Sequence, residues 1–295
     1  MQYRGLFVGL TTLDFIYLSD RPLQPNQKAI AKDYLAVAGG PATNAAIAFG
    51  SFNNFSQLFS VVGQHPLSTL IKDDLKQHQI DSLDLMPAKI VSPPVSSIIV
   101  TATTGERALI SLNAVKSQSS LEISSDCLDN IDLVLLDGHQ LEVSLQVAAI
   151  AKNRKIPLVL DGGSWKPGLE RLIPSIDYAI CSANFYPPQC QQQPQDHQAV
   201  FNWLLTQGVN YIAITRGEQP IVYCESPFNN PIYGTIDIPP IQAIDTLGAG
   251  DIFHGAFCHY ILQHNFNFAA ALKLASDIAS RSCLSFGTRS WMRKP

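Results

Sequence analysis

Short apolar runs alternate with amphipathic segments along most of this chain, and this alternation constrains the fold more than any other feature of the sequence. A short apolar run that ends at Gly, Asp or Thr is typical of a buried strand, whereas apolar residues at helical spacing indicate a helix. Strand and helix in regular succession predict an α/β fold, with a mostly parallel sheet and helices on both faces. The expected strands are Gly5–Gly9, Leu58–Gly63, Leu133–Asp137, Pro157–Asp161, Tyr178–Cys181 and Tyr211–Thr215, and the expected helices are Leu67–Gln77, Leu141–Lys152, Lys166–Leu172 and Val200–Gln207.

Three of the expected strands end at a polar residue. In such sheets ligands gather at the carboxyl ends of the strands. Asp137, Asp161 and Thr215 are therefore placed near a candidate site. Each of the three, taken alone, is better explained as a turn residue.

Two stretches depart from the alternation. Residues 15–38 are polar and interrupted by proline, and residues 95–113 form two β-rich runs around Thr104–Gly105, as a hairpin does. We expect the two stretches to form a small β-sheet that covers the site as a lid, and an ordinary surface hairpin is the alternative. Without an internal repeat or a long linker, residues 1–295 are expected to form a single domain.

The composition excludes several classes of protein. With 295 residues, 46% of them hydrophobic, and a net charge of −4, the chain resembles an ordinary globular protein and lacks the basic stripe of a general nucleic-acid binder. No segment approaches the ~18 apolar residues of a membrane span. The six cysteines have neither CxxC nor zinc-ligand spacing. We expect a cytoplasmic protein with free thiols and without nucleic-acid or membrane partners.

The most informative segment is DTLGAGDIFHGAF, residues 245–257. Gly248, Ala249 and Gly250 form a turn with minimal side chains, so that backbone N–H groups can approach a ligand closely. The helix expected from about Gly250 adds its free N–H groups and the positive end of its dipole. Together they predict an anion hole for a phosphate whose charge builds up in a transition state.

Asp251 follows in the first turn of that helix. Its carboxylate would lie beside the bound phosphate, where it can accept the proton of an attacking hydroxyl. An acid at this position also stabilises a helix N-terminus by roughly 0.3–1 kcal/mol without any catalytic role. On Asp251 alone the two interpretations are even, and the turn is neither the P-loop nor the GxGxxG fingerprint.

The full string Asp-Thr-x-Gly-Ala-Gly-Asp-x-Phe resembles the C-terminal signature of the PfkB-type carbohydrate kinases, the ribokinase-like family. The resemblance implies a kinase that uses ATP and Mg²⁺ to phosphorylate a hydroxyl of a small sugar-like molecule. It implies that Asp251 is the catalytic base and that Gly248, Ala249 and Gly250 hold the γ-phosphate. In several members the acid matched by Asp245 lies next to a monovalent-cation site, which makes K⁺ a candidate activator.

Upstream, GGPATN at residues 39–44 is similar to the N-terminal Gly-Gly motif of the same family. It opens an Ala-rich helix, with Pro41 at the first helical position and Gly50 at the end. In the family, Gly40 and Asn44 lie against the sugar. The spacing Gly9-x-x-x-x-Asp14 resembles the family's first strand and the acid that binds sugar hydroxyls. The resemblance therefore gives four substrate-binding candidates, Asp14, Gly39, Gly40 and Asn44.

The ATP side is expected from two further segments. Thr215-Arg216-Gly217 resembles the family's Thr-x-Gly turn, which contacts ATP phosphates, so Thr215 and Gly217 are ATP-binding candidates. In the last helix, Ser276 and Ala279 face the region where the family holds the adenine ring.

That last helix is expected over Phe268–Phe286, with Gly287 as its C-cap. The ending CLSFGTR, residues 283–289, resembles the subset of the family that contains sulfofructose and related ketose kinases. The segment DGGSWKPGLE, which starts at Asp161, resembles the same subset.

One part of the family pattern is missing. Members often carry Asn-x-x-Glu, which helps to position Mg²⁺ and phosphate. If Asn184 is the Asn, Pro187 stands in place of the Glu, and if Ser182 takes that position, Phe185 does. In either register the acid is absent.

Three other side chains have a functional and an ordinary interpretation. Arg107, on the hairpin, is a candidate for binding an anionic group of the substrate, although an exposed arginine is the commoner case. His254 is better explained as a helix-packing histidine and Trp165 as a residue that covers the core.

The sequence leaves two alternatives to a sugar kinase open and disfavours a third. A nucleoside kinase of the same fold would need an aromatic platform, which Phe15 or Tyr17 could supply. A non-catalytic sensor of sugar or nucleotide would explain the missing Glu, although it has no need for a base such as Asp251. A dehydrogenase is disfavoured because no GxGxxG follows the first strand. A homodimer through the lid sheets is expected from the family, and an exposed edge strand within residues 95–113 would favour it.

Overall fold

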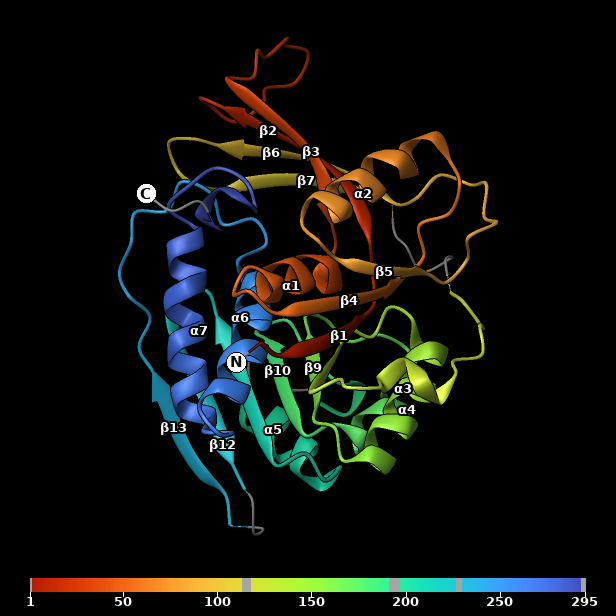
Figure 1. Ribbon diagram of the computed structural model, residues 1–295. Coiled ribbons are helices and arrows are strands. Elements are labelled where there is room, and N and C mark those ends of the chain that lie inside the picture. Colours follow the sequence, from red (N-terminus) through yellow and green to blue (C-terminus); the bar gives the residue numbers. More distant parts are fainter. Residues whose placement is uncertain (1, 113–117, 191–196, 227–229, 293–295) are drawn as a thin grey trace.

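The computed structural model of the chain describes residues 2–112, 118–190, 197–226 and 230–292. At its centre lies a nine-stranded sheet in the order β13-β12-β11-β10-β9-β8-β1-β4-β5 (Figure 1). Neighbouring strands from β5 to β11 are parallel, whereas β12 and β13 continue the sheet as antiparallel strands. The strand bounds are β1 Arg4–Val8, β4 Phe55–Ser60, β5 Asp81–Asp84, β8 Leu133–Leu136, β9 Leu158–Gly162, β10 Tyr178–Ser182, β11 Tyr211–Arg216, β12 Gln219–Glu225 and β13 Ile232–Ile236.

Helices cover both faces of this sheet, as the alternation in the sequence predicts. One face packs against α1, α2, α6 and α7, and the other against α3, α4 and α5. Successive side chains of a strand point to opposite faces: in β1, Phe7 joins the first core, while Leu6 and Val8 join the second. The helix bounds are α1 Pro41–Gly50, α2 Pro66–Gln77, α3 Leu141–Arg154, α4 Leu169–Leu172, α5 His197–Thr206, α6 Ala249–Gln263 and α7 Phe268–Ser282.

A second, four-stranded sheet stands at one end of the molecule, at the top of Figure 1. Its order is β3-β2-β6-β7, with bounds β2 Thr12–Ser19, β3 Asp33–Gly39, β6 Val95–Thr101 and β7 Arg107–Ser111. The β-rich stretches predicted at 15–38 and 95–113 thus meet in one small sheet, although Asn113 lies outside the described residues. The edge strand β7 is exposed along its whole length. The function of this sheet as a lid, and a dimer formed through it, stay predictions.

Several expected elements have different bounds. Strand β4 spans Phe55–Ser60 where Leu58–Gly63 is expected, and α5 begins at His197 where Val200 is expected. The helix expected at Lys166–Leu172 begins only at Leu169, because Gly168 adopts a left-handed conformation with φ 92° that a helix cannot contain. The last helix ends at Ser282 and not at Phe286. Gly287 is therefore not its C-cap. Its backbone N–H instead donates to the carboxylate of Asp245 across 2.9 Å, which fixes the C-terminal segment beside the turn before α6.

The strand order around β1 and the close packing of α6 explain why the site forms at the carboxyl end of β1. Strand β1 lies between β8 and β4. Strands β4 and β5 extend the sheet on one side of β1, and β8 to β13 extend it on the other side. Such a reversal of strand order opens a crevice at the carboxyl ends of the strands. Helices α1 and α6 pack closely side by side above this point (Figure 1). Gly255 permits that approach, because a Cβ atom there would lie 2.3 Å from the carbonyl oxygen of Ala45.

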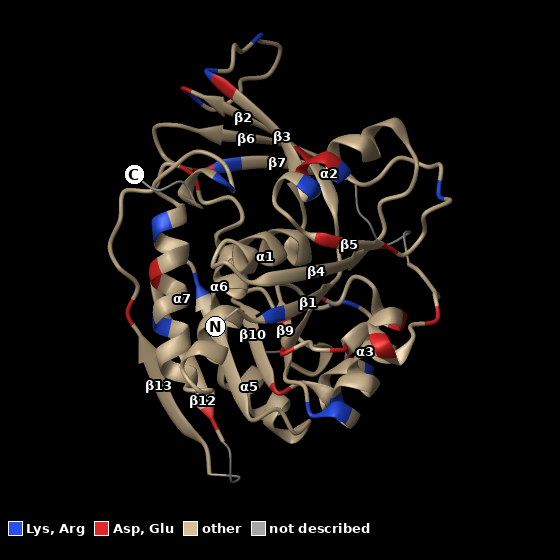
Figure 2. Ribbon diagram, in the orientation of Figure 1, with Lys and Arg blue, Asp and Glu red and all other residues tan. Residues whose placement is uncertain are grey.

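The remaining features concern charge and thiols. In the part of the chain that the structure describes, no helix is long and apolar enough to cross a membrane. Lys and Arg residues are scattered along the ribbon in the view of Figure 2 and form no continuous stripe there. The six cysteines form no disulfide among the described residues.

Candidate active site

The turn before α6 has the form that its three small residues predict. Gly248 is the N-cap residue, with φ 70°, a left-handed conformation that glycine adopts without strain. Gly250 faces open space, since a Cβ atom built on it would meet no atom within 4 Å. The backbone at the start of α6 is therefore open to a ligand, and the free N–H groups and the dipole of the helix favour an anion there.

Asp251 lies in the first turn of α6, within this opening. Burial raises the pKa of its carboxyl group to about 7, and the negative charge of Asp161 contributes to the rise. A hydrogen bond from Asn44 and the charge of His254 lower the pKa in part. A carboxyl group that titrates near neutral pH is suited to accept a proton in one step and release it in the next.

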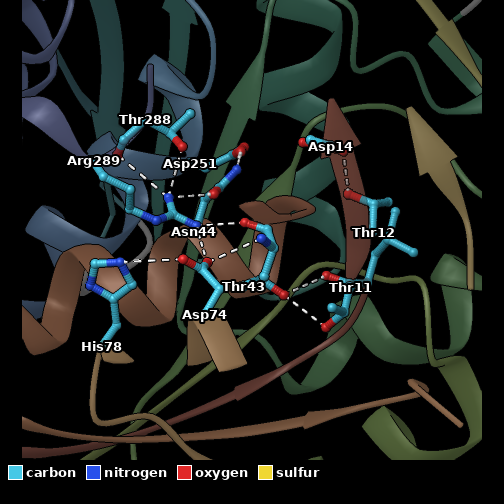
Figure 3. A network of polar contacts seen from close by, with 12 residues as sticks. Thr11, Thr12, Asp14, Thr43, Asn44, Asp74, His78, Asp251, Thr288 and Arg289 are labelled. Carbon is cyan, nitrogen blue, oxygen red and sulfur yellow. Dashed lines mark hydrogen bonds and ion pairs between the residues drawn. The ribbon is translucent and has the colours of Figure 1, made fainter. Parts of the chain in front are cut away.

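Asn44 brings the N-terminal motif to Asp251. It lies in α1, and its Nδ2 atom donates to Oδ2 of Asp251 across 2.7 Å, although the two residues are 207 positions apart (Figure 3). Its Oδ1 atom accepts a hydrogen bond of 2.9 Å from Arg289. Because Arg289 can only donate, it fixes the side-chain amide with the NH₂ group toward Asp251.

Asp14 completes the group from β2. It is buried, its Oδ1 atom accepts a 2.7 Å hydrogen bond from the hydroxyl of Thr12, and burial raises its pKa. Gly39 leaves room for it, because a Cβ atom at Gly39 would lie 1.9 Å from Oδ2 of Asp14. Gly40 has φ 97° and lies against the carbonyl oxygen of Leu10, so this turn also requires glycine.

The structure thus brings together Asp14, Gly39, Gly40, Asn44 and Asp251, which the sequence names as separate candidates. Their elements are β2, the β3–α1 turn, α1 and α6. All of them meet at the carboxyl end of β1, where the sheet topology opens the crevice.

Arg289 is a component of the site to which the sequence analysis assigns no role. Its guanidinium donates to Asn44, Thr288 and the carbonyl oxygen of Ala38 in β3, and lies 3.6 Å from a carboxylate oxygen of Asp74 in α2 (Figure 3). It therefore ties the C-terminal segment to α1, α2 and the small sheet. The only signal in the sequence is its place at the end of the FGTR string.

The ATP-binding candidates lie apart from this group. Thr215 ends β11, and its hydroxyl donates to the carbonyl oxygen of Cys181, while Gly217 forms the next turn with φ 65°. Ser276 is 2% exposed, and its hydroxyl donates to a carbonyl within α7; Ala279 is half-buried in the same helix. No hydrogen bond among the described residues joins these four to Asp251 or Asn44.

Arg107, the candidate on the hairpin, is exposed and donates a 2.8 Å hydrogen bond to the hydroxyl of Thr246. It thus connects β7 to the segment before α6. Both carboxylate oxygens of the neighbouring Asp245 accept backbone N–H groups, from Leu247 and Gly287, and burial raises the pKa of Asp245.

The strand-end acids have different surroundings. Asp137 accepts backbone N–H groups of Leu10, Ala42 and His139, so it behaves as the turn residue that the sequence favours. Asp161 lies next to His254, 3.5 Å from its Nδ1 atom, and belongs to the site. Trp165 packs on Phe185 and Trp203, in agreement with its expected place over the core.

The region of the missing acid is well defined. Ser182 donates to the carbonyl oxygen of Gly163 and accepts the backbone N–H of Asn184. Among the described residues, no group of three or more His, Cys, Asp or Glu side chains is arranged to hold a metal ion. Mg²⁺ keeps several waters and binds mainly through substrate phosphates, so it does not need a cage of protein ligands.

Comparison with known proteins gives one family. Residues 5–295 match the model of the pfkB family carbohydrate kinases. A deoxyribokinase of Salmonella typhimurium is 26% identical to this chain, and the match covers 96% of this chain and 93% of the deoxyribokinase. Ribokinase of Giardia lamblia superposes with a TM-score of 0.79 at 19% identity, over 99% of this chain and 97% of that one. Arabidopsis thaliana ribokinase, complexed with ribose and ATP, does so with a TM-score of 0.70 at 20% identity over the full length of both chains.

Proposed function

The chain belongs to the pfkB family of carbohydrate kinases, and on this premise we propose that Asp251 accepts the proton of a sugar hydroxyl while the γ-phosphoryl group of ATP is transferred to that hydroxyl. An ATP-dependent carbohydrate kinase needs an acceptor site, a base and a phosphate site within reach of one another. The observation that carries the proposal is the 2.7 Å contact between Asn44 and Asp251 at the open start of α6.

The acceptor is proposed to lie between Asp14, Gly39, Gly40, Asn44 and Asp251. Carboxylates accept hydrogen bonds from pairs of hydroxyls, and the amide of Asn44 can both donate and accept. We infer an uncharged polyhydroxy acceptor, because the carboxyl groups of Asp14 and Asp251 face this space. The terminal guanidinium nitrogens of Arg289, a cation that borders this space, already donate to protein oxygens.

Phosphoryl transfer would proceed at the N-terminus of α6. The backbone N–H groups of the Gly248–Gly250 turn would bind the γ-phosphoryl oxygens, where charge accumulates. The hydroxyl oxygen would attack the phosphorus atom as Asp251 takes its proton, and the bond to the ADP oxygen would break. Ionised Asp251 is required for this step, so its pKa of about 7 sets the lower pH limit of the reaction.

ATP would extend from this turn toward Thr215 and Gly217, with its adenine near Ser276 and Ala279. Mg²⁺ would offset the charge of the phosphates, held mainly by ATP oxygens and water. K⁺ is a candidate activator beside Asp245. The small sheet formed by β2, β3, β6 and β7 would act as the lid that keeps water from the phosphoryl group.

The test measures ADP release by the purified protein with Mg-ATP and a panel of uncharged aldoses, ketoses, deoxy sugars, sugar phosphates and nucleosides, with and without K⁺. We expect turnover with an uncharged sugar that Asp251→Asn removes. Turnover with sugar phosphates only would contradict the uncharged acceptor, and turnover with nucleosides only would make the chain a nucleoside kinase. ATP or sugar binding without any turnover would favour the sensor.

A further inference from the structure

His254 lies in α6 with both ring nitrogens against backbone carbonyl groups. Its Nδ1 atom is 2.7 Å from the carbonyl oxygen of Gly250, and its Nε2 atom is 3.1 Å from that of Ile180 in β10. A carbonyl oxygen accepts hydrogen bonds and cannot donate them, so each contact requires a proton on the ring nitrogen. Neutral imidazole carries one such proton and imidazolium carries two. The geometry around this buried ring is that of an imidazolium.

Asp161 provides the opposite charge. Its Oδ2 atom lies 3.5 Å from Nδ1 of His254, and both side chains are about one-twentieth exposed, at 5% and 6%. The same Oδ2 atom is buried and accepts no hydrogen bond from the described residues. An isolated buried carboxylate is costly, and the attraction of a neighbouring cation offsets part of that cost.

The His254–Asp161 pair is linked to the proposed base, Asp251, in two ways: by a hydrogen bond to the neighbouring peptide and by electrostatic interaction. The carbonyl group of Gly250, to which His254 donates, belongs to the peptide that joins Gly250 to Asp251. The charge of Asp161 raises the pKa of Asp251, and that of His254 lowers it. The pair therefore acts on both the position and the charge of the carboxylate.

Few other ionisable groups face these side chains. The thiols of Cys181 in β10 and Cys258 in α6 adjoin Asp161, and burial raises the pKa of both, so they are neutral. On the acceptor side lie Asp14 from β2 and Arg289 from the C-terminal segment, together with the uncharged Asn44 of α1. Within the described part of the chain, the charged groups that face Asp251 are thus Asp14, Asp161, His254 and Arg289.

We propose that His254 is an imidazolium paired with Asp161, and that this buried ion pair is a positioning device that holds the Gly250–Asp251 peptide in place and keeps Asp251 ionised. Without the imidazolium, Asp161 and Asp251 would be two neighbouring carboxylates, and such a pair shares a proton. The function assigned to the pair rests on the proposed role of Asp251 as the base, whereas its charge state does not.

The charge state is measured by NMR with ¹⁵N-labelled histidine, in the absence of any substrate. At pH 8.5, about two units above the ordinary histidine pKa of ~6.5, an unperturbed ring is neutral. Burial lowers the pKa of His259 to about 4, so that ring is also neutral. We expect one of the seven histidines to keep two protonated ring nitrogens. This signal should be lost in His254→Asn and in Asp161→Asn, and kept in His264→Asn, which changes an exposed histidine of the C-terminal end of α6.

A spectrum in which every histidine of the unmodified protein is neutral at pH 8.5 would overturn the proposal. This measurement uses the unmodified protein, so it tests the charge state of His254 even if a variant fails to fold. It also separates the two proposals, because a doubly protonated His254 in a protein without kinase turnover would refute only the proposed function.

The positioning role is tested by the pH dependence of kcat/KM. In His254→Asn the lower pH limit should rise by about one unit, which is a tenfold loss of rate below the limit. The double variant Asp161→Asn/His254→Asn removes both charges and should return the limit toward that of the unmodified protein. His264→Asn should leave it unchanged. A limit that does not move in His254→Asn would show that His254 only packs in the helix.

Discussion

Replacement of Asn44 by alanine tests the arrangement of the base most directly. Asn44→Ala removes the amide that donates to the Asp251 carboxylate across 2.7 Å. A hydrogen bond to a charged group contributes about 1.5–3 kcal/mol. One pKa unit corresponds to about 1.4 kcal/mol, so the loss corresponds to roughly 1–2 units. Asp251 keeps some contact with solvent, which favours the lower figure. We therefore expect its pKa to rise from about 7 by about one unit.

The sign of the effect follows from the chemistry of a base. Asp251 accepts a proton only when it is ionised, so the rate falls as the pH falls through its pKa in the folded protein. In Asn44→Ala the decline should begin about one pH unit higher. The plateau at high pH will also change, because Asn44 is a proposed contact of the acceptor. The midpoint of the decline does not depend on the height of the plateau, and it is the quantity to compare.

The assay is the initial rate of ADP release at low acceptor concentration across the range from about pH 5.5 to pH 9.5, where the ordinary Asp pKa of ~3.9 has no influence. Thr43→Val is the matched control, since Thr43 is the neighbouring residue of α1 and its hydroxyl contacts Thr11 and the carbonyl oxygen of Leu10 (Figure 3). It should lower the thermal midpoint and leave the pH midpoint in place. Equal pH midpoints in Asn44→Ala and the unmodified protein would refute the reasoning.

Four further substitutions provide three tests. Asp251→Asn should lose about 10²–10⁴-fold in kcat and gain about 1–3 kcal/mol of unfolding free energy at pH 8. The gain arises because the folded pKa lies above the unfolded one, so ionised Asp251 lowers stability as the pH rises through the interval from 3.8 to about 7. Urea unfolding that shows no gain at pH 8 would contradict this. Arg289→Met should cost about 3 kcal/mol in the same assay, because it leaves buried acceptors without their donor, and an unchanged midpoint would show that they have others. Gly255→Ala should lower stability by about 1–3 kcal/mol through its clash with the carbonyl oxygen of Ala45, whereas Gly250→Ala should melt normally and lose turnover; equal melting of the two would contradict the packing of α1 on α6.

Local patterns predict much of the fold. A strand or a helix shows its period within a few residues, which is why the parallel strands β1, β8, β9, β10 and β11 lie within a residue or two of their expected bounds. Pro41 and Gly50 likewise mark the two ends of α1. The outer strands β5, β12 and β13 are absent from the prediction. β5 and β13 are the two edges of the sheet and β12 lies next to β13, and all three carry a weaker apolar pattern than strands buried on both faces.

The site is predictable where a compact motif carries it and unpredictable where distant segments meet. Asp251 and Asn44 stand in recognisable strings, so both can be named in advance. Arg289 reaches Asn44 across 245 residues of chain, and no local period reports such a contact. His254 has the pattern of a packing residue of α6, and only the carbonyl groups of two separate elements show what its ring nitrogens contact.

The close packing of α1 on α6 has a consequence for the folding of the chain during its synthesis. Synthesis proceeds from the N-terminus, so α1 leaves the ribosome when most of the chain that will cover it does not yet exist. Its eight buried residues are then without their partner, and exposed apolar surface of this kind is prone to aggregation. Asp251 and Arg289 follow Asn44 by 207 and 245 positions, so the proposed active site can assemble only after both have been translated. A nascent chain of this protein should therefore expose the buried face of α1 until α6 has been translated, and should transfer no phosphoryl group before α6 and the segment with Arg289 have emerged.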